Sequence, residues 1–481
     1  MKALEVAGSD VRIMPRLQPV PDEQMQEIYH GVLRVIEKIG FRVAHPEALE
    51  LLAKAGCSVE DGSLVRIPRR LVEEAIGTAP KRIPIYDRQG NPALDLQGTN
   101  TYYGTGSDLP KTYDPFSSEL RSSTAQDIAN MARVVDYLPN IDFLMSYGIP
   151  FDRPNRLHYR YEFFEMVKNT TKPIVFTSSD GDDSRKIIEM AAVAVGGLHK
   201  LQAKPFILNY CQPISPLQHS LEGMGKILVC SELGIPINYP PGLMPGGTAP
   251  VTLAGAITLS IAEALSGLVI HQLKRPGSPI VLGGAHGCMD MMTTVNVYAC
   301  PERLLTMWVL SSFYQSLGIP TWGFGGCSDA QSLDEQAGME FAMLDMWASM
   351  TGVNLAHDTG YLGSGMIGAL EAIVFNDEII SYTKHVMRGI EVNDQTLALD
   401  AIERVGPGGH YLDDEHTAIN FRSALWKPGL SNRLRYDEWN KTGGKRLGER
   451  LNEKVRQILS EHQPKALSEE QIAQIEAIIN S

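Results

Sequence analysis

Aromatic and polar side chains gather just after a series of short apolar runs that are typical of β-strands. Aromatic faces attract cations, and each ring that faces a quaternary ammonium group contributes roughly 0.5–2 kcal/mol. These positions contain no lysine, so a Schiff-base mechanism has no candidate nucleophile there. We expect a pocket for a flat or cationic ligand, and packing of the rings in a core is the alternative. The side chains concerned are Tyr102, Tyr103, Asp108, Tyr147, Tyr210, Gln212, Tyr239, His286, Trp322, Phe324, His357, Asp358 and Tyr361.

Three glycine clusters follow runs of the same kind, at residues 104–106 (GTG), 283–287 (GGAHG) and 323–326 (GFGG). Glycine permits tight turns, and it also lets a bulky partner approach the backbone closely. Because the clusters recur after several strands, we favour close approach of a bulky partner over turn formation alone.

Two sets of side chains have the types that bind metal ions. His286, Cys288 and Cys327 are zinc ligands by type. A second set would suit a hard cation or a hydrolase site, and it comprises Asp180, Asp329, His357 and Asp358. Neither set has a tight motif such as HxH or HExxH. We therefore expect no bound metal in this chain, and the zinc set stays open as an alternative.

His357 and Asp358 form an adjacent histidine–aspartate pair at the end of a predicted strand. Successive side chains of a strand point to opposite faces. The alternation predicts that His357 points into the site and that Asp358 caps or braces the following loop.

The apolar runs and the segments between them predict the architecture. Eight runs recur at intervals of roughly 30 to 44 residues, which is enough for a strand, a loop and a crossover helix. They lie at residues 101–103, 143–147, 174–177, 206–211, 235–239, 280–282, 319–322 and 353–357. Helix-length segments follow them, starting near residues 124, 158, 184, 218, 251, 301, 333 and 367. The pattern predicts an α/β fold, a (β/α)8 TIM barrel. An open doubly wound sheet is the alternative, but the first run lacks GxGxxG.

The barrel is predicted to carry an extension at each end. Residues 1–82 form a helical N-terminal extension, and residues 83–390 form the barrel with a preceding hairpin at 83–86 and 93–96. Residues 391–481 form a charged, helical C-terminal extension that we expect to wrap the barrel or the interface of a homo-oligomer.

Composition excludes several classes of partner. The net charge of −13 disfavours nucleic acid and anionic membranes. The 6 cysteines include no CxxC pair, which favours a reduced, intracellular protein. The N-terminus lacks an apolar segment of secretory length, and the apolar stretch at 251–273 contains Glu263 and His271, as expected of a buried helix. We therefore predict a cytoplasmic protein.

Several motifs together resemble the trimethylamine methyltransferase superfamily. They are TYYGTG at 101–106, PISPL at 213–217, the segment 242–273, GFGGCSDAQSLDEQAG at 323–338, GYLGSGMIGALEAIVFNDEII at 360–380 and GERLNEKV near the end. The resemblance covers nearly the whole chain. It implies a TIM barrel with helical extensions, an oligomeric assembly, and transfer of a methyl group from a methylated amine to the Co(I) corrinoid of a separate carrier protein.

One position departs from the founding trimethylamine enzymes. Those enzymes carry pyrrolysine just before the segment that matches Cys327, and here Gly326 occupies that place. The relatives without pyrrolysine act on quaternary amines such as glycine betaine, proline betaine or carnitine. The resemblance therefore implies a quaternary amine substrate, with glycine betaine as the first expectation.

A quaternary ammonium group needs no general acid, base or metal, because its leaving group is already a neutral amine. The enzyme must align the methyl group and hold the cation in a dry cage. We assign the cage to Tyr102, Tyr103, Tyr147, Trp322 and Tyr361. His286 and His357 are candidate donors to the substrate carboxylate or to the corrinoid. Gly326 and His357 are the candidate catalytic positions, and the corrinoid is expected to approach Gly284, Gly325 and Gly326.

Two other functions remain open at this point. A zinc-dependent methyltransferase on the same barrel would use His286, Cys288 and Cys327 to activate a thiol. A non-catalytic protein that binds quaternary amines would need only the aromatic cage.

Overall fold

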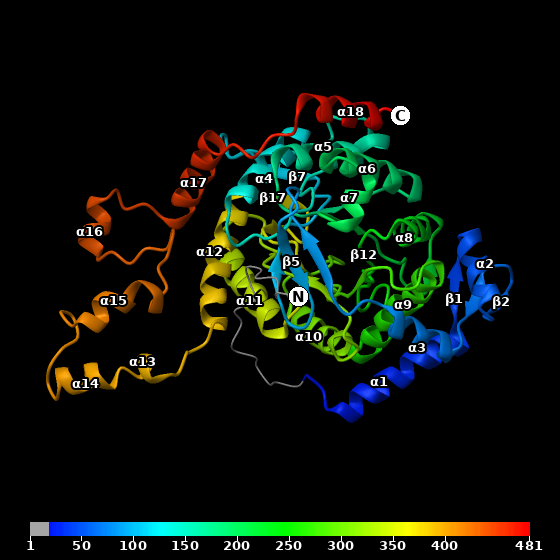
Figure 1. The fold of residues 1–481 in the computed structure, drawn as a ribbon, viewed down its shortest axis with the longest axis horizontal. Helices are drawn as coiled ribbons and strands as arrows, with labels where there is room; N and C mark the ends of the chain where they lie inside the picture. Colours follow the sequence, from blue (N-terminus) through cyan, green and yellow to red (C-terminus); the bar gives the residue numbers. More distant parts are fainter. Residues whose placement is uncertain (1–18) are drawn as a thin grey trace.

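The computed structural model describes residues 19–481, and its centre is a TIM-barrel-like fold (Figure 1). Parallel strands form a 7-stranded sheet in the order β6-β15-β14-β13-β12-β10-β9. Their bounds are β6 Tyr102–Tyr103, β9 Ile174–Phe176, β10 Ile207–Tyr210, β12 Ile237–Asn238, β13 Ile280–Gly283, β14 Thr321–Phe324 and β15 Leu355–His357. The segment around Phe143 lies between the edge strands β6 and β9, through isolated parallel bridges from Gly104 to Phe143 and from Leu144 to Ile174. The predicted eight-stranded arrangement is confirmed, with this eighth position held by bridges instead of a regular strand.

Helices follow the strands and surround the barrel (Figure 1). They are α4 Ala125–Tyr137, α5 His158–Asn169, α6 Gly181–Val195, α7 Leu198–Ala203, α8 Leu221–Leu233, α9 Leu253–Lys274, α10 Pro301–Ser316, α11 Glu335–Thr351 and α12 Leu370–Met387. Local sequence sets their ends. The Asp180 carboxylate accepts a hydrogen bond from the Asp183 backbone N–H at the start of α6, and Gly196 ends that helix in the left-handed conformation.

Helix α9 is long and apolar enough to cross a membrane by length and composition alone, but 78% of its apolar window is buried inside the protein. Its Gly267 lies against Tyr239, since an added Cβ would stand 2.3 Å from the tyrosine ring. The prediction of a buried helix at 251–273 is therefore confirmed.

A hairpin closes the end of the barrel at which the strands begin. Strands β4 (Ile83–Tyr86) and β5 (Pro92–Leu96) pair antiparallel, as predicted. Their apolar side chains form one core cluster with inward-facing residues of the barrel strands, which include Tyr102 and Trp322. This cluster is the floor of the barrel, so an open site must lie at the other end.

A second small sheet, which the sequence patterns did not predict, lies beside the mouth. It has the order β16-β17-β7-β8, and its strands are β7 Lys111–Tyr113, β8 Leu120–Ser122, β16 Tyr361–Leu362 and β17 Ile367–Gly368. Strands β7 and β16 follow barrel strands β6 and β15, so the sheet holds the connections that leave two neighbouring strand ends.

The N-terminal extension is not wholly helical, contrary to the prediction. It contains α1 Asp22–Arg34, the π-helical turn η1 Val35–Ile39, β1 Phe41–Val43, α2 Pro46–Lys54, β2 Ser58–Glu60, β3 Leu64–Arg66 and α3 Arg69–Thr78. Its three short strands join β11 (Gln218–His219), a strand from the connection between β10 and α8. The strands form because this connection offers an edge with which β1 pairs.

The C-terminal extension is helical, as predicted. Its helices are α13 Asp394–Leu397, α14 Leu399–Val405, α15 Glu415–Ala424, α16 Tyr436–Lys441, α17 Leu447–Glu461 and α18 Glu469–Ile479. Helix α17 packs against α4 and α12, and α18 packs against α5 and α6. The segment from α13 to α16 extends away from the barrel as an arm, at the left of Figure 1.

Candidate active site

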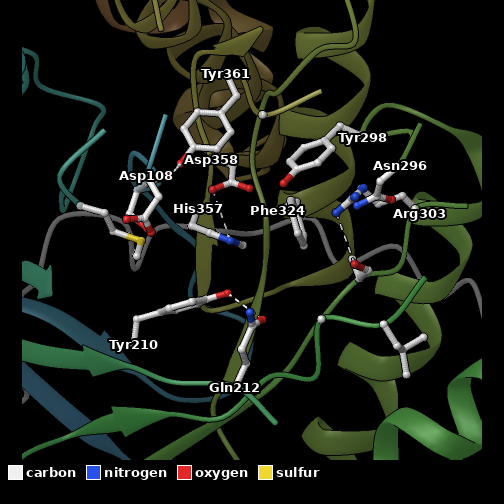
Figure 2. A pocket seen from close by; sticks show the side chains of 17 residues that line it. Asp108, Tyr210, Gln212, Asn296, Tyr298, Arg303, Phe324, His357, Asp358 and Tyr361 are labelled. Atoms are coloured by element: carbon white, nitrogen blue, oxygen red, sulfur yellow. Dashed lines mark hydrogen bonds and ion pairs between the residues drawn. The ribbon is translucent and has the colours of Figure 1, made fainter. Parts of the chain in front are cut away.

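A cavity of about 320 Å3 lies where the barrel strands end. Its walls come from the segments that follow β6, β10, β12, β13, β14 and β15, which is the end of a TIM barrel that carries active sites. Aromatic and charged side chains line it together (Figure 2). The labelled lining residues are Asp108, Tyr210, Gln212, Asn296, Tyr298, Arg303, Phe324, His357, Asp358 and Tyr361.

His357 and Asp358 both line this cavity. The prediction that only His357 points into the site is wrong, because β15 ends at His357 and the Asp358 backbone turns to a φ of 64°. A left-handed residue at this position breaks the alternation of the strand. The His357 Nε2 and Asp358 Oδ1 atoms are 3.4 Å apart.

His357 is held as a neutral ring. Its Nδ1 donates to the Gly323 carbonyl oxygen at 2.6 Å, because a carbonyl can only accept, and Nε2 is therefore the unprotonated nitrogen that faces Asp358. The ring lies 4.5 Å from Trp322 and 4.4 Å from Phe324, centroid to centroid. Burial, with a smaller contribution from the nearby Arg303 charge, lowers the pKa of His357 to about 3.

The two carboxyl groups of the cavity resist ionisation. Burial, together with repulsion from Asp108, raises the pKa of Asp358 to about 7, and the Arg303 charge opposes this rise. Burial also raises the pKa of Asp108. A cation that enters the cavity would favour the charged form of both groups.

Three aromatic rings form one wall. Tyr298 lies 6.1 Å from Phe324 and 6.4 Å from Tyr361, centroid to centroid. The Tyr361 hydroxyl donates to the backbone oxygen of Ser107, which holds the ring across the mouth. Tyr361 is a residue that we predicted for the cage, and the structure places it in the cavity wall.

Arg303 is a buried guanidinium on the first turn of α10, with 2% of its surface exposed. Its central carbon lies 3.8 Å from the centroid of Phe324 and 4.7 Å from that of Tyr298. Nη1 donates to the Ala285 carbonyl at 3.3 Å, Nε has no hydrogen-bond partner, and no carboxylate of the described residues forms an ion pair with Arg303. This side chain can bind a ligand carboxylate.

Tyr102 and Tyr103, two of the predicted cage residues, do not line the cavity. Tyr102 belongs to the floor cluster, where its hydroxyl accepts the Asp95 backbone N–H at 3.1 Å. Tyr103 points outward to α11, and its hydroxyl donates to the Asp345 carbonyl at 2.6 Å. Neither ring faces the space that a substrate would occupy.

Tyr147 and Trp322 lie behind the wall. The Tyr147 ring is 5.8 Å from Tyr361, and its hydroxyl donates to the Gly360 carbonyl at 2.7 Å. Trp322 lies beneath His357, and its buried Nε1 has no hydrogen-bond partner. Both residues support lining residues without lining the cavity themselves.

The glycine positions do not open toward the cavity. A Cβ at Gly326 would stand 1.9 Å from Asn376 Oδ1, and the Gly326 N–H donates to Asp345 Oδ1 at 2.7 Å. A Cβ at Gly325 would stand 2.5 Å from Thr359 Oγ1. The expectation that Gly326 leaves free room is therefore wrong, since polar side chains already fill the space beside it.

Gly284 and His286 belong to the connection after β13. A Cβ at Gly284 would have ordinary contact with His286 Cε1, at 3.4 Å. The His286 ring is 1% exposed, is absent from the cavity lining, and has no hydrogen-bond partner on either nitrogen. It is a buried neighbour of the site, and burial lowers its pKa to about 3.

The zinc set that was kept as an alternative is not assembled. Among the described residues, the one group of three or more histidine, cysteine or acidic side chains within metal-binding reach contains Cys288 but neither His286 nor Cys327. Cys327 is fully buried, and burial raises the pKa of its thiol.

The sequence reasoning missed Asn296, Tyr298 and Arg303. All three belong to the connection between β13 and α10 or to the first turn of that helix. A usable signal was present, because residues 284–300 form an unusually long connection at the strand ends, and long loops there commonly serve function.

Comparison with known proteins agrees with this architecture. The sequence model of the trimethylamine methyltransferase (MTTB) family matches residues 3–481. A glycine betaine methyltransferase of Desulfitobacterium hafniense (strain Y51) is 29% identical over 472 residues, which cover 97% of this chain and 98% of the relative. A trimethylamine methyltransferase MttB of Methanosarcina thermophila is 30% identical over 488 residues, with coverage of 99% and 100%.

A solved structure shares the fold. The monomethylamine methyltransferase MtmB of Methanosarcina barkeri superimposes with a TM-score of 0.50 at 10% identity, and covers 95% of this chain and 89% of its own. At that identity the likeness concerns the fold alone. With the family match along the whole chain, it follows that this chain belongs to the trimethylamine methyltransferase (MTTB) family and is a methyltransferase.

Proposed function

We propose that this enzyme moves a methyl group from a small zwitterionic quaternary amine to the Co(I) corrinoid of a separate carrier protein. Glycine betaine is the first candidate substrate, and proline betaine and carnitine are the next. The family membership supports methyl transfer, and a relative named glycine betaine methyltransferase supports the choice of amine.

The observation that carries the proposal is the distribution of charge across the cavity. Arg303 is buried and forms no salt bridge with a described residue on one side, while the half-buried Asp108 and the buried Asp358 present carboxyl groups on the other (Figure 2). Unpaired buried charges are costly, and a ligand with both signs would compensate each of them. A betaine has this form, with a carboxylate at one end and an ammonium group at the other.

The residues of the chain would orient the substrate. Arg303 would hold the carboxylate through its free N–H groups, and Tyr298, Phe324 and Tyr361 would surround the methylated nitrogen. A charged Asp358 would attract the cation from the same side. This arrangement takes over the carboxylate-binding role that we first assigned to His286 and His357.

The reaction itself needs little from the protein beyond alignment. The corrinoid, as the second substrate, would supply Co(I), whose electron pair would form the new bond to the methyl carbon. The carbon–nitrogen bond would break in the same step, and its electron pair would leave with the nitrogen as a neutral tertiary amine. Because positive charge on nitrogen disappears, no residue has to deliver a proton. A dry, oriented cavity favours this step, since it removes the water that stabilises the separated charges.

A substrate panel tests the activity. The purified protein would be incubated with Co(I) cobalamin and glycine betaine, proline betaine, carnitine, choline or trimethylamine. We expect methylcobalamin absorbance and the demethylated amine with the betaines at a much higher kcat/KM than with choline or trimethylamine. Binding without turnover would leave the non-catalytic alternative standing and contradict the proposal, as would turnover of trimethylamine alone.

Substitution of Arg303 tests the substrate class. Arg303→Gln should lower kcat/KM for glycine betaine by about 10- to 100-fold. Because choline lacks the carboxylate, its kcat/KM should fall less, so the ratio of the two kcat/KM values should decrease. Arg153→Gln is the matched control, because Arg153 lies over Tyr161 at the surface, 5.2 Å from the ring centroid. If Arg303→Gln lowers kcat/KM equally for both substrates, Arg303 does not bind the substrate carboxylate.

A further inference from the structure

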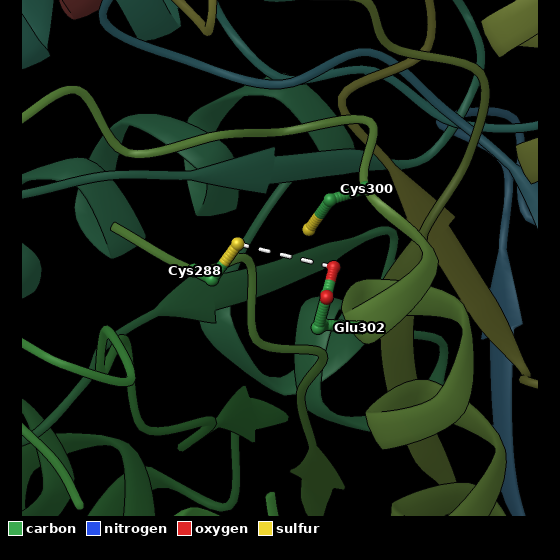
Figure 3. A group of neighbouring side chains, drawn as sticks. All are labelled: Cys288, Cys300 and Glu302. Atoms are coloured by element: carbon green, nitrogen blue, oxygen red, sulfur yellow. Dashed lines mark hydrogen bonds between the residues drawn. The ribbon is translucent and has the colours of Figure 1, made fainter. Parts of the chain in front are cut away.

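Two cysteines and a glutamate converge beside the active site. The ligand atoms of Cys288, Cys300 and Glu302 all lie within 4.8 Å of one another, and Figure 3 shows the three side chains pointing to a common point. Cys288 begins the exposed part of the connection after β13, Cys300 precedes α10, and Glu302 lies in its first turn. The two ends of a long loop thus meet at this cluster.

The cluster lacks strong internal partners. The Cys288 Sγ lies 3.9 Å from Glu302 Oε2, and the Cys300 Sγ lies 3.9 Å from the Val297 carbonyl oxygen. Burial, together with the neighbouring Cys300 and Glu302, raises the pKa of the Cys288 thiol to about 11. Three groups that gain negative charge side by side repel one another, and a bound cation would reverse this effect.

We propose that Cys288, Cys300 and Glu302 bind a thiophilic divalent cation of the zinc type, with water as the fourth ligand. Two thiolates and a carboxylate are ligands that zinc accepts, and Cys288 is only half-buried, so a metal ion can reach it. Binding releases one proton from each thiol, and no oxidant or reductant takes part. This site differs from the zinc set that the sequence left open as an alternative, because it excludes His286 and Cys327.

The ion would fasten the loop that completes the active site. The segment between Cys288 and Cys300 carries Asn296 and Tyr298, and Arg303 follows one residue after Glu302. A metal that ties the two ends of this segment would restrict it before substrate enters. We therefore assign the cation a positioning role and not a part in the methyl transfer.

Cobalt substitution tests the site without reference to activity. The full-length protein, kept reduced and stripped with a chelator, would be titrated with Zn2+ and Co2+. We expect about one ion per chain by elemental analysis and a thiolate-to-cobalt charge-transfer band. Cys288→Ser and Cys300→Ser should each weaken metal binding by at least about 10-fold, and Glu302→Gln should weaken it less.

Cys57→Ser is the matched control, since Cys57 is a half-buried thiol of the N-terminal extension. It should leave stoichiometry and spectrum unchanged, and circular dichroism would verify that every variant is folded. The proposal is overturned if reduced wild-type protein binds no metal, if folded Cys288→Ser keeps the wild-type metal affinity and band intensity, or if mass mapping shows that the two thiols form a disulfide in the presence of zinc.

Discussion

Asp358 is the residue whose ionisation decides the charge of the cavity. Its carboxyl group lies 3.4 Å from the unprotonated Nε2 of His357, so a protonated Asp358 has an acceptor within reach. The folded-state pKa of about 7 means that both forms exist near neutral pH. Without substrate, a protonated Asp358 can pair with the neutral His357 ring. With substrate bound, Asp358 can lose its proton and face the ammonium group as a carboxylate.

We predict that substrate capture depends on this ionisation. With wild-type enzyme, kcat/KM for glycine betaine should rise as pH rises through about 7, because the charged carboxylate attracts the ammonium group. Asp358→Asn should abolish this pH dependence, and at pH values above the rise it should lower kcat/KM by about 10- to 100-fold. The exposed Asp413→Asn serves as the control, and an unchanged pH profile in Asp358→Asn would assign the ionisation to another group.

The same pKa makes a prediction about stability. An aspartate titrates near pH 3.9 in an unfolded chain, so between that value and about 7 the folded protein binds the proton more tightly. Asp358 therefore destabilises the fold progressively as pH rises through this window. The Tm of Asp358→Asn minus the Tm of wild type should therefore increase as pH rises through the same range. Calorimetry at several pH values would measure this difference.

At single residues, sequence patterns predicted position better than orientation. Tyr361 and His357 both line the cavity, because His357 ends β15 and Tyr361 lies in the connection that follows it. Tyr102 and Tyr103 form the whole of β6, and one points to the floor while the other points to α11. Neither direction could be predicted from the residue type, since both depend on how far that strand is shifted along the barrel axis.

Among the secondary structure elements, the hairpin β4–β5 gives the barrel its floor. Leu96 is fully buried and packs in one cluster with the inward faces of Trp322 and Leu355. The sequence showed this hairpin through its alternating apolar residues and its turn at residues 90–92. Its position under the barrel could not be predicted, because nothing local to a hairpin specifies which surface it covers.

We predict that the floor is a major source of stability. Leu96→Ala should lower the free energy of unfolding by about 2–5 kcal/mol, because it leaves a cavity among side chains that cannot collapse freely. Leu120→Ala on β8 is the control, since that side chain is 40% exposed and should cost far less. Urea unfolding would measure both, and equal losses would show that the hairpin packs loosely.

The small sheets show what periodicity misses. Strands β16 and β17 have two residues each and β1–β3 have three, which is too short for a recognisable alternation. They form because a long-range partner, such as β11 for β1, is already held in place by the barrel. The eight barrel positions were predictable because each combines an apolar run with a following helix.

In the molecule as a whole, the arm from α13 to α16 is the segment that extends away from the barrel. It carries apolar side chains that the described chain leaves in solvent, among them Leu412 at 89% exposure, Leu425 at 66% and Ile419 at 65%. A surface with so many exposed apolar groups is typical of an interaction site. The expected homo-oligomer would cover these side chains with a second copy of the chain.

We therefore predict that the protein in solution has a mass that is a multiple of 52.9 kDa, measured by light scattering after size exclusion. The double variant Leu412→Glu, Leu425→Glu should shift the mass toward that of one chain, because burying two carboxylates in an apolar interface is unfavourable. Ile39→Glu, at a 55% exposed position of the N-terminal extension, should leave the mass unchanged. A wild-type protein of 52.9 kDa would contradict the assembly, and a double variant that remains oligomeric would place the interface on another surface.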